Sequence, residues 1–237
     1  MRLDGYTPPL HCAVVNHSSL AKDEEISFWC EAVNKQIREH VAPAWQVPPM
    51  AVVFYGPSVK IPSDQAAVIG IVDDDNNSES AGYHTQLGDL VYGLVDMSQS
   101  SIPSRVLSHE ALEIFTDAFL DRLVNGPDSL KYFTECADPC QADGYKVPVT
   151  LFGVSKDVTV SDFCLPAWYD LPSLETAVGP YNRLGTMTRP FEIAYGGYAL
   201  AQDEKGRVLF LSHAKGAMMS AAKMNRTSRT SRIVRTA

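Results

Sequence analysis

Helical and extended apolar patterns alternate in the first half of the sequence. The first helical pattern begins near Ser19 and is expected to end at Pro43, because proline lacks the backbone donor that a helix needs. Its apolar residues recur at helical spacing, at Ile26, Trp29, Val33, Ile37 and Val41. Strand-like runs, mostly rich in Val and Ile, lie before and after it, at residues 12–16, 51–55, 66–72 and 90–97.

A second helical pattern runs from about Pro103 to Val124, where Asn125-Gly-Pro127 is a strong termination signal. Beyond it the chain shows short strand patterns, many prolines and glycines, and no long periodic helix. This order predicts an α+β fold. We expect three parts, namely an α/β half at 1–126, an irregular β-rich half at 127–214 and a basic C-terminal arm at 215–237.

Charge is unevenly distributed between the arm and the rest of the chain. The arm holds six basic residues and no acidic one, so the other 214 residues hold 14 basic and 28 acidic residues. Such a segment is typical of a flexible solvated arm, or of an arm that binds a neighbouring copy or another protein. Nucleic-acid binding would rest on phosphate attraction alone, because no aromatic residues are interleaved with the basic ones.

The remaining composition indicates a protein of the cytoplasm, or one packaged from there. No run approaches 18 apolar residues, so no membrane span is expected, and the N-terminus has no apolar stretch of a signal peptide. The five cysteines are scattered and odd in number, which favours reduced thiols.

The second helix carries the residues that point to chemistry, in Ser108-His-Glu-Ala-Leu-Glu113. Residues four apart share one face of a helix, so His109 and Glu113 project together and offer a nitrogen and an oxygen to Zn²⁺. Glu110 points about 100° away around the helix, where it can reach a water at the metal and act as a general base.

A catalytic zinc needs a third protein ligand. Glu135 is the leading candidate, because the turn at Asn125-Gly-Pro127 lets the chain double back over the helix. Asp117 on the same helix competes for this role. Asp138 can instead accept the free N–H of His109 and fix its tautomer. His84 could line a substrate cleft, but we expect it to be an exposed turn residue.

The pattern H-E-x-x-E with a downstream glutamate resembles the zincin metallopeptidases, and most of all their thermolysin-like branch, whose motif is H-E-x-x-H. The resemblance implies a small sheet behind the active-site helix, His109 and Glu135 as zinc ligands, Glu110 as general base, and Glu113 in place of the second histidine. Together with Gly82-Tyr-His84, Glu135-Cys-Ala-Asp138-Pro and residues 161–168, it is similar to a zincin-like group found in bacteria and tailed phages.

The resemblance implies a zinc-dependent peptidase or related hydrolase acting on a peptide or protein. A tyrosine or histidine of the second half would then stabilise the oxyanion, and Tyr145 is the candidate. Glu113 adds a negative charge, which weakens the Lewis acidity of the metal. The alternative is a structural protein, for example of a phage particle, that uses the same fold as a building block and its arm for assembly.

Overall fold

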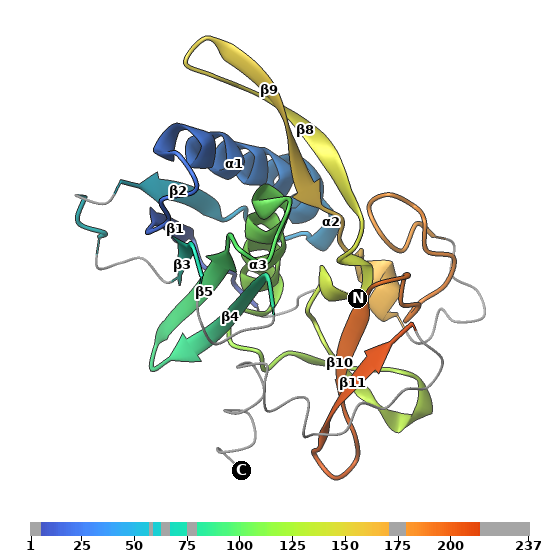
Figure 1. Ribbon diagram of the computed structural model, residues 1–237. Helices are drawn as coiled ribbons and strands as arrows, with labels where there is room; N and C mark the ends of the chain where they lie inside the picture. Colours follow the sequence, from blue (N-terminus) through green and yellow to red (C-terminus); the bar gives the residue numbers. More distant parts are fainter. Residues whose placement is uncertain (1–5, 57–58, 63–66, 75–79, 171–178, 214–237) are drawn as a thin grey trace.

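The computed structural model describes residues 6–56, 59–62, 67–74, 80–170 and 179–213 (Figure 1). Its helices are α1 (Asp23–Gln36), α2 (Ala42–Trp45) and α3 (Pro103–Asp117), with a π-helical turn η1 (Ile37–Val41) between the first two. The strands of the first half are β1 (His11–Asn16), β2 (Ala51–Tyr55), β3 (Ala67–Val72), β4 (Gly82–Leu87) and β5 (Leu90–Asp96). Those of the second half are β6 (Leu123–Asn125), β7 (Lys131–Phe133), β8 (Gly144–Leu151), β9 (Val154–Ser161), β10 (Tyr198–Gln202) and β11 (Val208–Ser212). The prediction of an α+β protein is confirmed.

A five-stranded mixed sheet organises the first half, in the order β2-β1-β3-β5-β4. Strands β1, β2, β3 and β5 are parallel, and β4 pairs antiparallel with β5 at one edge. Helices α1 and α3 contact each other and the sheet, so they cover the same face of it. The apolar runs that predicted strands and helices thus meet in one buried layer.

The β8–β9 hairpin packs along α1 and α3 (Figure 1). Helix α3 therefore has neighbours on several sides, and all but three of its fifteen residues are buried. Polar side chains on this helix are consequently held inside the protein and away from bulk water.

The second half adds a four-stranded sheet, β11-β10-β7-β6, and, among its described residues, three 3₁₀ turns, η2 (Pro127–Ser129), η3 (Asp138–Cys140) and η4 (Pro166–Tyr169). The main apolar core is continuous across Gly126, since it joins Leu107 and Phe115 of α3 to Phe163 and Trp168. All five cysteines are buried free thiols.

The first helix differs from its prediction at both ends. It begins at Asp23 because the carboxylate of Asp73 accepts hydrogen bonds from the backbone and hydroxyl of Ser19 and from the backbone of Leu20, which holds that segment outside the helix. Pro43 does not end the helical path. It lies in the first turn of α2, which continues directly from the π-helical turn η1.

The second helix ends at Asp117 and not at Val124. The Asp117 carboxylate accepts hydrogen bonds from the backbone N–H groups of Asp121 and Arg122 at 3.0 and 3.1 Å. Leu120 adopts a φ of 55°, which is incompatible with a right-handed helix. The predicted last turn is therefore a loop that leads into β6.

Strand β4 was missed at the sequence level, and with it the environment of His84. Gly88 and Asp89 form a two-residue turn between β4 and β5, with a φ of 62° at Gly88. His84 lies in the middle of β4 and is fully buried, so its reading as an exposed turn residue is wrong.

In the described part of the chain, no helix is long and apolar enough to cross a membrane. The basic arm lies outside the described residues.

Candidate metal centre

Two histidines and four carboxylates from different elements meet in the interior beside α3. His109, Glu110 and Glu113 come from α3 itself, and His84 comes from β4. Glu135 precedes η3, and Asp138 begins it. All six residues are buried. Buried charged groups are costly unless they are paired or bind a cation, so this cluster requires a functional or structural explanation.

The first compact group consists of His109, Glu113 and Asp138. His109 Nε2 lies 3.0 Å from Glu113 Oε1 and 3.2 Å from Asp138 Oδ1. Two ligands of one tetrahedral zinc ion are about 3.4 Å apart when each metal–ligand bond is about 2.1 Å. The three side chains thus converge at nearly the spacing that zinc needs.

The second compact group consists of His84, Glu110 and Glu113, and it could hold a metal ion as well. His84 Nδ1 lies 3.4 Å from Glu110 Oε2 and 3.5 Å from Glu113 Oε2. The other ring nitrogen, Nε2, lies 3.7 Å from Glu135 Oε1. Glu113 therefore belongs to both groups.

The electrostatic field of the cluster is strongly negative. Burial alone would lower the pKa of His109, but Glu113 and Asp138 raise it well above its usual value. The pKa values of Cys136 and Tyr169 are also well above the usual range, chiefly because of burial and further because of Glu113 and Glu135. A cation is therefore favoured at this point of the structure.

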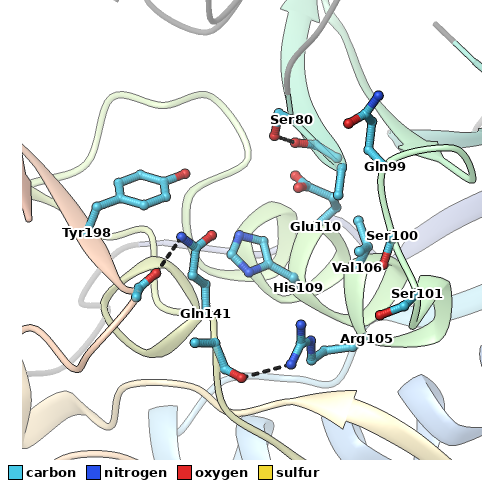
Figure 2. A pocket seen from close by; sticks show the side chains of 14 residues that line it. Ser80, Gln99, Ser100, Ser101, Arg105, Val106, His109, Glu110, Gln141 and Tyr198 are labelled. Atoms are coloured by element: carbon cyan, nitrogen blue, oxygen red, sulfur yellow. Dashed lines mark hydrogen bonds between the residues drawn. The ribbon is translucent and has the colours of Figure 1, made fainter.

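An open pocket gives access to the first group. His109 and Glu110 form part of its lining, together with Arg105, Gln141 and Tyr198. Figure 2 shows His109 between Gln141 and Tyr198 on one side and Glu110 on the other. The side chain of His109 is 10% exposed and that of His84 is fully buried, so the two histidines lie at different depths.

The structure brings most of the residues predicted from the sequence into the cluster and leaves Asp117 outside both compact groups. His109, Glu110 and Glu113 lie together as the helical spacing predicts. Glu135 lies beside His84, with its Oε1 3.7 Å from His84 Nε2. Asp138, and not Glu135, forms a compact group with His109 and Glu113. Asp117, the competing ligand, accepts the backbone hydrogen bonds beyond α3 and belongs to neither group.

Tyr145, the candidate for oxyanion stabilisation, is not among the residues that line the pocket. Its hydroxyl group lies 2.8 Å from His40 Nδ1 and accepts a hydrogen bond from Gln36 Nε2 at 3.2 Å. The tyrosine of the pocket is Tyr198, at the start of β10.

His84 and the ligand-like position of Asp138 are the features that sequence reasoning missed. The Gly88-Asp89 turn was the signal for β4, and a strand beside α3 would have placed His84 next to the motif. Asp138 was expected on the other nitrogen of His109. Its contact with Nε2, the nitrogen that faces Glu113, depends on the path of η3, which no local pattern encodes.

Two supports fix the cluster in place. Behind α3, Ser108 donates to Gln36 Oε1 at 2.7 Å and accepts from the backbone of Ser161 at 3.0 Å. Near η3, a Cβ on Gly197 would collide with the carbonyl group of Pro139, so only glycine permits β10 to approach Asp138 this closely.

The comparisons with known proteins add no family. No family model, curated protein or solved structure matches the chain.

Proposed function

We propose that the protein is a zinc-dependent hydrolase of the metallopeptidase kind, with its zinc held by His109, Glu113 and Asp138. The observation that carries the proposal is the convergence of Glu113 Oε1 and Asp138 Oδ1 on His109 Nε2 at 3.0 and 3.2 Å, beside an open pocket. One nitrogen and two oxygens are ordinary zinc ligands, and an opening beside them leaves room for a substrate.

The residues around this position support roles in hydrolysis. A zinc ion bound there would supply Lewis acidity, which polarises a carbonyl group towards attack by water. Glu110 lines the same pocket and would take the proton of the attacking water. Tyr198 and Gln141, across His109 from Glu110, would donate hydrogen bonds to a substrate carbonyl group (Figure 2).

A peptide substrate is the most specific part of the proposal. It is supported by the H-E-x-x-E helix with its buried carboxylates and by the backing sheet, both of which agree with the zincin resemblance. The pocket lining is polar around His109 and includes Arg105, which can bind a carboxylate or carbonyl group of a substrate.

The test separates binding from catalysis. Purified wild-type protein is expected to bind zinc, and His109→Ala is expected to lose the ion at the position between Glu113 and Asp138. Glu110→Gln is expected to keep that ion but to hydrolyse a mixed library of quenched fluorescent peptides at least about 100-fold more slowly, because the amide cannot accept a proton. The exposed Asp157→Asn is the matched control for loss of a carboxylate. Absence of zinc after reconstitution at neutral pH would refute the proposal, and equal hydrolysis by Glu110→Gln would refute the role of Glu110.

A further inference from the structure

The carboxylate of Glu113 faces two histidines at once. Its Oε1 lies 3.0 Å from His109 Nε2, and its Oε2 lies 3.5 Å from His84 Nδ1. A carboxylate placed between two nitrogen ligands in this way can bind one cation with each oxygen, as bridging carboxylates do in sites with two metal ions.

Each end of this bridge has its own third ligand. Asp138 lies at the His109 end, and Glu110 lies at the His84 end with its Oε2 3.4 Å from His84 Nδ1. Both ends therefore offer one imidazole nitrogen and two carboxylate oxygens, which is a suitable donor set for zinc or a similar divalent cation.

We propose that the cluster holds two divalent cations, bridged by Glu113. The first lies between His109, Glu113 and Asp138, and the second between His84, Glu110 and Glu113. This inference rests on the proposed zinc binding at His109 and adds a second position to it. Glu135 Oε1 lies 3.7 Å from the other nitrogen of His84, so Nδ1 is the nitrogen that faces Glu110, Glu113 and the proposed second ion.

Charge balance favours two ions over one. The four buried carboxylates carry four negative charges when they are ionised, and one divalent cation offsets only two of them. Two divalent cations offset all four while both imidazoles stay neutral, which is the form in which they bind metal. A buried site with no net charge avoids the large cost of uncompensated charge.

The two positions differ in access. His109 borders the pocket, whereas His84 is fully buried behind it, so the second ion would lie deeper. Glu110 turns Oε2 towards His84, and its Oε1 lies close to Gly82 at the pocket. The role of Glu110 as a base therefore belongs to the protein with only the first position filled, in which Glu110 carries no cation.

The test counts ions per chain in the full-length protein. Metal-free protein is titrated with Zn²⁺ and its content is measured by elemental analysis after removal of unbound ions. We expect two ions in the wild type, one in His84→Ala and one in His109→Ala. His11→Ala, a change of an exposed histidine on β1, is the matched control and keeps two.

A second measurement uses the wild-type protein, because variants that lose a buried side chain can also lose their fold. Protein loaded with two Mn²⁺ ions is expected to show an exchange-coupled electron paramagnetic resonance spectrum, because a bridging carboxylate joins the ions. Protein loaded with one Mn²⁺ is expected to show the spectrum of an isolated ion.

The outcomes separate the two proposals. One ion in the wild type, or two uncoupled ions, overturns the bridged pair and leaves the proposed function intact. Retention of two ions by His84→Ala places the second ion elsewhere and also overturns it. Absence of any bound ion overturns the proposed function itself.

Discussion

The buried acidic side chains of α3 bind different partners. Glu113 connects His84 with His109, while Asp117, one turn further along, binds the backbone of the following loop. Both are fully buried acids on one helix, yet their partners differ. The chemistry of a residue here follows from what the tertiary structure places opposite it.

The pocket tyrosine, and not Tyr145, is expected to contribute to hydrolysis. Tyr198→Phe removes a hydroxyl group from the pocket while keeping the ring that stacks on Phe210 at 4.6 Å, so we expect a loss of at least about tenfold in kcat/KM. Tyr145→Phe loses contacts with His40 and Gln36 and is expected to lower stability by about 1 kcal/mol with activity within about twofold. Peptide hydrolysis and thermal melting of both variants check this. A larger loss of activity in Tyr145→Phe would return the oxyanion role to Tyr145.

Asp117 is expected to make the stability of the metal-free protein depend on pH. Burial is the main cause that raises its pKa from 3.8 to about 6. Folding therefore favours the protonated carboxyl group, so its contribution is fully present below pH 3.8 and is lost as the pH rises to about 6. Asp117→Asn keeps an oxygen for the N–H groups of Asp121 and Arg122 but carries no charge.

We expect this variant to gain stability over the wild type between pH 4 and pH 6, and to level off above that at a gain of roughly 3 kcal/mol. Chemical denaturation of metal-free proteins across this range measures the effect, with Asp157→Asn as the exposed control. A difference that does not change with pH would contradict the explanation.

At the scale of elements, α1, α3 and the β8–β9 hairpin are joined by one buried amide. Gln36 of α1 donates to the carbonyl group of Ser161 at 2.7 Å and accepts from Ser108 of α3 at 2.7 Å. Ser108 is adjacent to His109. The amide thus ties the helix of the candidate metal centre to its two neighbours.

Replacement of Gln36 by methionine keeps the size of the side chain and removes these hydrogen bonds. Because the hydroxyl group of Ser108 and the carbonyl group of Ser161 lose partners in the interior, we expect a loss of roughly 2–3 kcal/mol. Gln86→Met, which removes a hydrogen bond to Gly88 at the surface, is expected to cost less than about 1 kcal/mol. Urea denaturation compares the two. Equal losses would show that the buried amide has no special role.

At the scale of the whole molecule, the residues that the structure describes already enclose an apolar core. Its buried apolar side chains lie between Cys12 and Val208, and in the sequence the arm begins after β11. Residues 1–214 carry a net charge of −14, and the basic arm carries a net charge of +6. This difference favours contacts of the arm with another copy of the chain or with an acidic partner.

Truncation after Ala214 is therefore expected to keep the fold and the bound zinc but to abolish assembly or partner binding. Thermal melting and sedimentation of the truncated and full-length proteins measure both properties. Unchanged assembly would remove the main support for a structural role of the protein. A large fall in the melting temperature would show that the arm is part of the core.

The sequence by itself determined the elements whose signal is local. The 3.6-residue period predicted α1 and α3, and the i, i+4 spacing predicted that His109 and Glu113 share a face, because helical geometry depends only on neighbouring residues. The Val- and Ile-rich runs likewise predicted β2, β3 and β5, with bounds accurate to within a residue or so at each end. The end of α3 was predicted seven residues too late, since it depends on how Asp117 binds the following loop.

Only the tertiary structure decided which residues complete the candidate metal centre. His84 reaches it because β4 pairs at the edge of the sheet beside α3, and Asp138 reaches it because Gly197 lets β10 approach η3 closely. These contacts join residues that are 26 and 29 positions from Glu110 and His109, respectively. Their closeness results from packing and from burial of the whole core, and no pattern of neighbouring residues contains that information.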